Sequence, residues 1–486
     1  MFRNSGDVYS WLCGFINLEQ GSGSPPAATA EHFKLERMRI LAGLADHPER
    51  SAPAIHIAGS KGKGSVTAMI CAILEAAGEK TARYLSPHVS DWRERISGGG
   101  GFFSEALYLA AGRELHEIHD KYRNRYAAAG KSKGGSVPGG ATFFELCTLY
   151  FFLCARLARS TMMIVETGLG GRLDATNIME SLVSVITPIE KEHTAYLGNS
   201  LEGIAREKAG ILKNGRPLVS SEQVPEVRSV LCRTAKERGS PFFYLPDCYA
   251  AEDIRIHPEG TDFILRDISS APAFLGLPLS LSVPGRVQAQ NAALAVLAIR
   301  TAAKTGFAVS KALDPANPSG KAALRRGLTS FSLPARFERF RGGPSEPALV
   351  IDGAHTAKSA GLCAETFCSL YGEGGILLFG CAADKDAAAM AAVLVRRFSR
   401  CVITGTGNFR AARPEAVYRT FKAASEMEGP GLKTVVLVPD PTAALAEALR
   451  AGRENSLPVL CCGSFYLAAE IRNSLEKKDM PARPPG

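Results

Sequence analysis

The chain has 486 residues, a length that favours two or three domains over one. Its 46% hydrophobic and 22% charged residues are typical of a globular protein, and no run of about 20 apolar residues could span a membrane. The formal net charge of +9 is spread thinly, which gives no sign of a nucleic-acid surface. The 12 cysteines include no C-x-x-C pair, and the N-terminus shows no signal peptide, so we expect a cytoplasmic protein with reduced thiols.

From about Pro53 onward, short apolar runs alternate with amphipathic stretches. This alternation predicts a mostly parallel sheet covered by helices on both faces. The expected elements of this first series are strands at 54–59, 81–85, 161–167 and 182–188, and helices at 65–78, 142–158 and 200–212.

A second, smaller α/β series begins after Pro334. Residues 325–338 between the two series are the candidate linker, which places a domain boundary near Leu333 and divides the chain into 1–333 and 334–486. A basic, glycine-rich stretch at 122–140 is expected to form an inserted loop. The expected elements of the second series are strands at 348–353, 375–380, 401–405, 434–438 and 458–463, and helices at 358–370 and 387–398.

The stretch "IHIAGSKGKGSV" lies between the first predicted strand and its helix, where a phosphate-binding loop is expected. It does not match the common G-x-x-x-x-G-K-[ST] pattern, because Gly64, not a hydroxyl residue, follows Lys63. The alternative is a plain glycine-rich turn. A phosphate site without that hydroxyl needs another residue to bind the metal. The candidate phosphate-binding residues are Gly59, Ser60, Lys61, Gly62, Lys63, Gly64 and Ser65.

Polar side chains follow the next three predicted strands, at the sheet edge where ligands collect in such folds. Ser86 and His88 follow the second strand, Glu166 the third, and Glu192 and His193 the fourth. A lone histidine after a strand is more often structural, but a hydroxyl, a carboxylate and an imidazole together favour a metal–phosphate site. Oxygen ligands of this kind suit Mg²⁺.

Motifs spread over nearly the whole chain resemble the folylpolyglutamate synthase and dihydrofolate synthase family of the Mur ligase superfamily. In chain order they are "HIAGSKGKGS", "SPHV", "TFFE", "ETGLGGRLDATN", "EHT", "AREKAGI", "GRVQAQN", "PARFE", "IDGAH", "CAADKD" and "CCGSFYL". The resemblance implies an α/β protein with an N-terminal P-loop-type ATPase domain and a smaller Rossmann-like C-terminal domain. It also implies ATP-dependent addition of L-glutamate to a folate or dihydropteroate carboxylate through an acyl phosphate. Apart from the resemblance, we expect no nucleic-acid or membrane partner, and we take a monomer as the default oligomeric state.

The resemblance assigns roles to single residues of this chain. Lys63, Lys208 and His193 would be catalytic, with ATP and Mg²⁺ as cofactors. The implied magnesium ligands are Ser86, Glu166, His193 and Lys208 as a carbamate; the further ATP contacts are Asn291, Arg336, Asp352 and His355; and the substrate side comprises Thr142, Phe143, Phe144, Glu145, Leu173, Asp174 and Ala175.

Two of these assignments have structural alternatives. Lys208 could be a solvated helix lysine, and Asp352 with His355 could be a turn pair. If Lys208 carries the carbamate, we expect alanine there to give an inactive but stably folded protein, because alanine suits a helix and leaves no buried partner unpaired.

The chain also departs from the family pattern. Glu192 stands where the family usually has Asp, Val287 replaces a histidine, and Thr356 replaces an asparagine. Lys61 replaces the asparagine of many bacterial members and resembles members that only extend polyglutamate tails.

Two other functions remain open on the sequence. The first is a superfamily ligase acting on a cell-wall nucleotide precursor, although the phosphate loop begins within about 60 residues, too early for the extra N-terminal domain of about 100 residues expected of those enzymes. The second is a P-loop NTPase switch or a nucleic-acid-dependent motor, which the loop spelling and the lack of a basic stripe disfavour.

Overall fold

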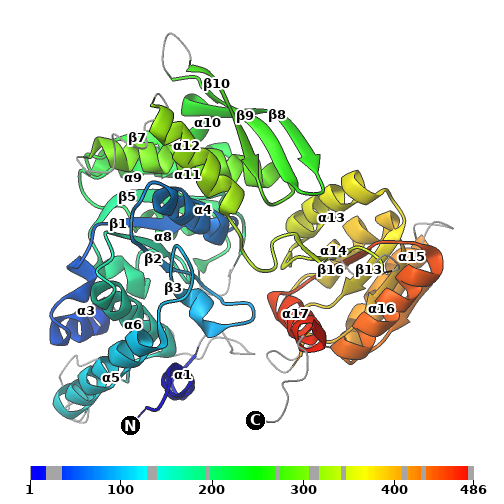
Figure 1. The fold of residues 1–486 in the computed structure, drawn as a ribbon, viewed down its shortest axis with the longest axis horizontal. Coiled ribbons are helices and arrows are strands. Elements are labelled where there is room, and N and C mark those ends of the chain that lie inside the picture. Colours follow the sequence, from blue (N-terminus) through cyan, green and yellow to red (C-terminus); the bar gives the residue numbers. More distant parts are fainter. Residues whose placement is uncertain are drawn as a thin grey trace.

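The computed structural model describes residues 2–17, 35–127, 140–192, 197–269, 274–305, 317–340, 346–407, 413–427 and 434–479. Two α/β bodies lie next to each other, and a small antiparallel sheet sits on the first of them (Figure 1). The predicted fold class, a mostly parallel sheet in each of two α/β units, is confirmed. No helix in the described ranges is long and apolar enough to cross a membrane.

The first sheet has seven strands in the order β3-β2-β4-β1-β5-β6-β7, and only β3 runs antiparallel to its neighbour. Its centre is formed by the four predicted strands of the first series. The bounds are β1 Ala54–Ala58, β2 Thr81–Tyr84, β3 Ile96–Gly98, β4 Met162–Glu166, β5 Ser181–Ile186, β6 Leu218–Ser220 and β7 Phe242–Tyr244.

Both faces of this sheet are covered by helices because its central strands are apolar on both sides. Ile55 and Ile57 of β1 pack in one cluster with α4, α11 and α12, whereas Ala54 packs in another with α1, α3, α5 and α6. Helices α8 and α9 cover the end near β6. The bounds are α1 Ser5–Cys13, α3 Leu35–Leu44, α4 Lys63–Ala76, α5 Glu105–Tyr122, α6 Phe143–Leu157, α8 Leu201–Ala209, α9 Pro225–Glu237, α11 Arg286–Lys304 and α12 Pro318–Ser330.

A three-stranded antiparallel sheet, which the sequence analysis did not anticipate, follows the short helix α10 (Leu245–Cys248). It consists of β8 (Tyr249–His257), β9 (Gly260–Asp267) and β10 (Phe274–Leu281). Phe263 and Leu265 of β9 are buried in the main core cluster, so this sheet packs with one face inward.

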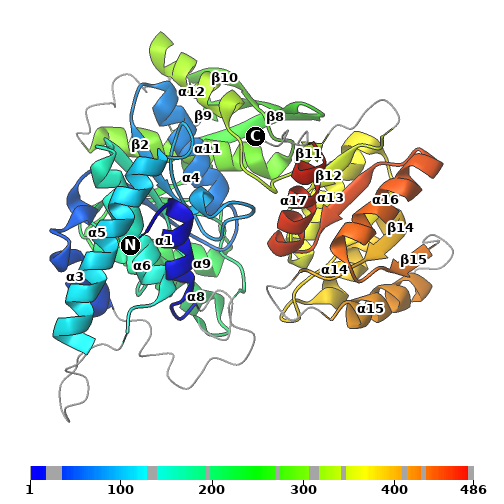
Figure 2. The ribbon, with the colours of Figure 1, turned by 60° about the horizontal axis from the view of Figure 1, so that its bottom comes forward.

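The C-terminal sheet has six strands in the order β11-β12-β16-β13-β14-β15, with only β11 antiparallel. Helices α13, α14 and α15 cover one face, and α16 and α17 cover the other (Figure 2). The bounds are β11 Glu338–Phe340, β12 Leu349–Ile351, α13 Ala357–Tyr371, β13 Gly375–Phe379, α14 Ala387–Leu394, β14 Phe398–Ile403, α15 Pro414–Met427, β15 Thr434–Leu437, α16 Pro441–Asn455, β16 Val459–Cys462 and α17 Phe465–Asp479.

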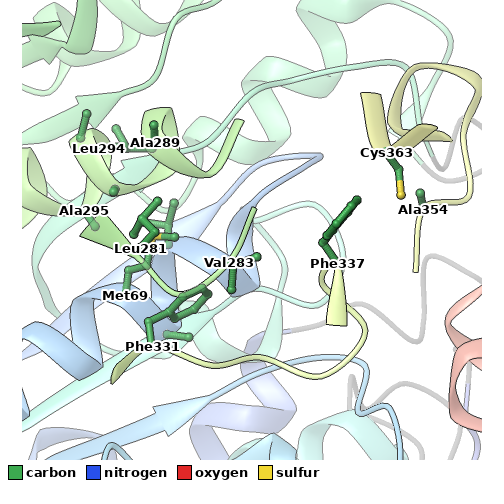
Figure 3. Close-up of a cluster of buried hydrophobic side chains, with 14 of the residues drawn as sticks. Met69, Leu281, Val283, Ala289, Leu294, Ala295, Phe331, Phe337, Ala354 and Cys363 are labelled. Carbon is green, nitrogen blue, oxygen red and sulfur yellow. The ribbon is translucent and has the colours of Figure 1, made fainter. Parts of the chain in front are cut away.

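The connection between the two bodies is shorter than the stretch predicted as a linker. Residues 325–330 are the last turns of α12, where Leu328 packs in the core, so the linker prediction was wrong there. Buried side chains continue across the connection: Phe337 lies between Val283 on one side and Ala354 with Cys363 on the other (Figure 3). One apolar cluster therefore joins the two bodies.

Candidate active site between the two domains

A cavity of about 1300 Å³ lies between the two bodies, with residues of both in its wall. Its volume exceeds the roughly 300–1,000 Å³ that is usual for one small-molecule site. The predicted site residues that line it are Ser60, Lys61, Gly62, Lys63, Gly64, Ser65, Ser86, Thr142, Phe144, Glu145, Glu166, Leu173, Asp174, Ala175, Asn291, Arg336, Asp352 and His355.

The predicted phosphate loop connects β1 to α4, as its sequence context indicates. Gly62 is the N-cap of α4 with φ +85°, and a Cβ there would lie 2.8 Å from Oδ1 of Asn291, so both the backbone angle and the close approach require glycine. The N–H groups of Ser60 and Lys61 donate to the Pro188 carbonyl at 2.9 and 3.2 Å. An anion would therefore meet the first N–H groups of α4 instead.

Two charged side chains face each other behind this loop. Nζ of Lys63 donates to the Gly59 carbonyl at 3.1 Å and lies 3.9 Å from Oε1 of Glu166, at the end of β4. Burial raises the pKa of Glu166 to about 7, opposed by the charges of Lys63 and Arg336 and by a backbone hydrogen bond from Ser86. A buried carboxylate beside a hydroxyl residue is a donor set that fits a hard cation.

Lys208 lies behind the loop and does not line the cavity. It is only 2% exposed, and its Nζ donates to the Gly59 carbonyl at 2.8 Å and to Oε1 of Glu192 at 2.9 Å. The alternative of a solvated helix lysine is therefore wrong. Burial lowers the pKa of Lys208 to about 8, although Glu192 acts in the opposite direction.

Not all of the predicted magnesium ligands lie among the described residues. His193 falls outside the described residues, and within them no group of three or more His, Cys, Asp or Glu side chains could hold a metal ion. Ser86 and Glu166 are neighbours at the cavity wall, whereas the hydrogen bonds of Lys208 are to Gly59 and Glu192.

The C-terminal body contributes a buried arginine to the cavity. The guanidinium of Arg336 lies 4.3 Å above the ring of Phe465, and its Nη2 would lie 3.8 Å from a Cβ on Gly64 of the phosphate loop. Asp352 is buried nearby, where its carboxylate accepts hydrogen bonds from the N–H groups of Phe337 and Ala354, each at 2.8 Å. It therefore holds the turn that carries Arg336.

His355 makes a contact between the two bodies. Its Nδ1 lies 2.8 Å from the Gly353 carbonyl, and its Nε2 lies 3.3 Å from Nζ of Lys61. Burial lowers the pKa of His355 to about 3, so the ring is neutral and Nε2 accepts from the Lys61 ammonium. Thr356, one of the departures from the family pattern, is the N-cap of α13 and forms a capping box with Ser359.

The predicted substrate side is built on the N-terminus of α6 and the turn before a short 3₁₀ helix, η5 (Ala175–Ile178). Thr142 caps α6, and Glu145 closes the capping box while accepting two hydrogen bonds of 2.8 Å from Nε of Arg37. Asp174 accepts from the N–H groups of Gly168, Leu169 and Thr176, at 2.9, 2.9 and 3.0 Å. Both carboxylates thus shape the cavity wall.

Phe143 does not lie where the prediction of a substrate contact requires it. Its side chain is fully buried, with Tyr9 against its ring and the guanidinium of Arg95 above it, so it does not line the cavity. The capping box sets the phase of α6, which turns Phe144 toward Gly168 and the cavity and Phe143 away from it. Gly59 is likewise hidden behind the loop.

Sequence reasoning missed two residues that organise the site. Arg37 is 1% exposed on α3, and an arginine among Met38 and Leu41 on the buried face of that helix was the available signal. Phe465 belongs to the "CCGSFYL" motif but received no role, although its ring lies beneath Arg336 and 5.5 Å from the His355 ring.

Comparison with known proteins gives the site its context. Residues 335–465 match the family model described as Mur ligase, glutamate ligase domain. A Bacillus subtilis (strain 168) protein named dihydrofolate synthase/folylpolyglutamate synthase is 30% identical over 479 residues, covering 98% of this chain and 100% of that protein. The protein of that name from Mycobacterium tuberculosis is 34% identical over 406 residues, which cover 82% and 78% of the two chains.

A solved structure agrees with the sequence relatives. The crystal structure of Mycobacterium tuberculosis folylpolyglutamate synthase, complexed with ADP and AMPPCP, is similar with a TM-score of 0.79 at 28% identity, over 93% of this chain and 96% of that one. The two-body architecture is thus shared with a protein whose structure was solved in complex with adenine nucleotides. The chain belongs to the dihydrofolate synthase/folylpolyglutamate synthase family of Mur ligases, and it is an ATP-dependent ligase of that type.

Proposed function

We propose that this chain joins the amine of L-glutamate to the carboxylate of a folate or a dihydropteroate, using ATP. The acceptor carboxylate oxygen takes the γ-phosphoryl group, and ADP leaves. The glutamate nitrogen then attacks the acyl carbon of this acyl phosphate, the C–N bond forms, and phosphate leaves as the nitrogen loses a proton. The supporting observation is that one cavity joins the phosphate loop to Arg336 and His355 of the other body.

The positive groups around the loop are suited to the charge that moves during phosphoryl transfer. Lys63 and Arg336 approach Glu166 from the two bodies, so the phosphate chain would lie between cations held on separate elements. Because an acyl phosphate hydrolyses readily, a site closed between two bodies also protects the intermediate from water.

Glu166 and Ser86, with His193 as the predicted third ligand, would hold Mg²⁺ in this site. When bound, the ion would neutralise phosphate charge and polarise the transferring group. The residues present fit this role because Glu166 is a buried carboxylate whose burial opposes ionisation unless a cation compensates it.

A carbamate on Lys208 is part of the same proposal. An unprotonated amine reacts with CO₂ to give the carbamate and a proton, and burial favours the unprotonated amine, since the pKa of Lys208 is lowered to about 8. A carbamate would add a second negative group beside Glu192, now 2.9 Å from Nζ. We therefore propose that Glu192 turns away or that a cation lies between the two groups.

Described residues of both bodies of one chain line the cavity, which supports the proposal that the chain acts as a monomer. We also propose a domain boundary near Leu333, since α12 ends at Ser330 and β11 begins at Glu338.

Equilibrium binding tests the substrate class. Titration with pteroate, folate and a uridine nucleotide of muramic acid should show saturable binding of the first two and none of the third. Binding of the muramyl nucleotide alone would instead support a ligase of cell-wall precursors.

A further inference from the structure

Arg472, on α17, joins the two bodies at a point outside the cavity. Its Nη1 donates to Oγ of Ser90 at 2.9 Å, and its Nε lies 2.9 and 3.0 Å from the two carboxylate oxygens of Glu338. Helix α17 lies on the side of the C-terminal body that faces the N-terminal body in both views (Figures 1 and 2). One guanidinium thus contacts a loop of the first body and the first strand of the second.

The Ser90 contact leads to the phosphate side of the cavity. Val89, the neighbour of Ser90, packs against an apolar cluster formed only by C-terminal residues, among them Leu467 and Ile471 of α17. Four residues before Ser90, Ser86 lines the cavity and hydrogen-bonds through its backbone to the Glu166 carboxylate. The position of this loop, and of Ser86 within it, therefore depends on the C-terminal body.

The Ser90 loop, residues 86–91, is itself compact. The carboxylate of Glu94 accepts hydrogen bonds from the N–H groups of Val89, Ser90 and Asp91, at 2.6, 3.0 and 3.0 Å. Because three successive N–H groups bond to one carboxylate, residues 89–91 are held together, and Ser86 is three residues away from them along the chain.

The Glu338 contact leads to the other side of the cavity. Oε2 of Glu338 accepts from the Ala335 N–H at 2.9 Å. Ala335 and Phe337 have φ angles of +52° and +48°, which residues other than glycine rarely adopt, and Arg336 lies between them. Such backbone persists only where surrounding contacts hold it, so the carboxylate that binds Ala335 helps to fix the direction of Arg336.

We propose that Arg472 is a positioning residue, which couples the docking of the C-terminal body to the assembly of the nucleotide site. Its guanidinium contacts both the Ser90 loop, which follows Ser86, and Glu338, which helps to fix Arg336. Ser86 and Arg336 are thereby held in one arrangement relative to each other. A planar fork can serve both partners at once, which a lysine ammonium cannot do with the same geometry. The inference rests on the proposed function, because that proposal places nucleotide phosphates between Ser86 and Arg336.

A partly exposed ion pair contributes little to stability, whereas a small displacement of catalytic groups can cost about 10²-fold in rate. Arg472→Met keeps the apolar stem and removes the fork. We expect it to weaken AMPPCP binding in the presence of Mg²⁺ by about 10-fold and to lower kcat/KM for ATP by about 10²-fold, while the melting temperature stays close to that of the wild type. Arg450→Met is the matched control, since among the described residues Arg450 pairs with Glu447 and Glu454 of its own helix.

A second variant, at Ser90, tests the same contact without changing Arg472. Ser90→Ala should weaken AMPPCP binding in the same direction, and the double variant should lose less than the sum of the two single changes in log affinity. AMPPCP affinity at the wild-type level in Arg472→Met, or a loss equal to that in Arg450→Met, would overturn the inference. Because AMPPCP binding needs no acceptor, a wild-type protein that binds it but adds no glutamate would refute the proposed reaction and leave this comparison decisive.

Discussion

Nζ of Lys208 lies 2.9 Å from Oε1 of Glu192, and the same Nζ donates to the Gly59 carbonyl at 2.8 Å. One buried lysine therefore connects α8, the loop after β5 and the end of β1. The expectation that alanine at 208 would leave no buried partner unpaired stays a prediction: Glu192 would lose this contact, but its Oε2 also lies 4.0 Å from Nζ of Lys61. The longer side chain of Glu192, one of the departures from the family pattern, makes the contact with Lys208.

For Lys208, the structure changes the expected effect on stability but not on activity. Lys208→Ala should be nearly inactive and less stable than the wild type, because a buried side chain and its hydrogen bonds to Gly59 and Glu192 are lost. Lys208→Met/Glu192→Met should recover much of that stability without recovering activity. Urea denaturation and a ligation assay of the three proteins measure both effects.

If Lys208 carries a carbamate, two further results are expected for variants of this residue. Formate or acetate should partly restore ligation by Lys208→Ala, and Lys208→Arg should stay inactive, because a guanidinium keeps the charge but does not form this carbamate. A fully active Lys208→Arg enzyme would show that Lys208 acts only as the cationic partner of Glu192.

A variant of Lys63 tests whether the loop binds phosphate. Lys63→Ala should reduce ligation by at least about 10²-fold, because it removes a positive charge that faces the transferring phosphoryl group. Lys236→Ala, an exposed position on α9, is the control and should keep wild-type activity. Near-normal activity of Lys63→Ala would restore the alternative of a plain glycine-rich turn.

Glu166 predicts a pH dependence of stability. Its pKa is raised by burial from 4.5 to about 7, so between these values the folded protein binds more protons than the unfolded chain. Without divalent ions, the free energy of unfolding should therefore fall as the pH rises from 5 through about 7, and this contribution should level off above that pH. Glu166→Gln should lack this decrease, which urea denaturation at several pH values in EDTA would measure.

Magnesium supplies the control for that experiment. If the ion binds Glu166, Mg²⁺ should stabilise the wild type at pH 8 and have much less effect on Glu166→Gln. Parallel pH curves for the two proteins, together with equal responses to Mg²⁺, would remove Glu166 from the metal site.

Arg37 and Glu145 form a buried pair that holds the N-terminus of α6. Arg37→Met should lower the free energy of unfolding by about 3–5 kcal/mol, because Glu145 is left buried without its partner. The double variant Arg37→Met/Glu145→Leu should be less destabilised, and Arg39→Met, at an exposed position of the same helix, should be close to wild type. A double variant less stable than Arg37→Met would contradict this account of the pair.

Much of the architecture could be predicted because the signals are local. The runs that became β1, β4 and β5 are apolar on both faces, and the glycine pattern before α4 marks a strand-to-helix turn. Part of the antiparallel sheet also has a local signal that the sequence analysis did not use. Buried and exposed side chains alternate along β9, where Phe263 and Leu265 are buried and Asp262 is exposed.

What could not be predicted depends on contacts between distant residues. Whether Phe143 or Phe144 faces the cavity is decided by the capping box of α6 and by Arg37, 108 residues before Glu145. The burial of Lys208 depends on Gly59, 149 residues away, and Arg472 reaches Ser90 across 382 residues. No local pattern carries such pairings, since each is set by how the sheets and domains pack.

The most direct measurement is the mass of the reaction products. Purified protein is incubated with ATP, Mg²⁺ and isotopically labelled L-glutamate, in separate reactions with dihydropteroate and with tetrahydrofolate. The account predicts that at least one acceptor gains the mass of one labelled glutamyl residue, with equimolar ADP formed and no product when ATP is omitted. If neither acceptor gains that mass while the protein still binds AMPPCP, the proposed ligation of glutamate to a folate or pteroate is wrong.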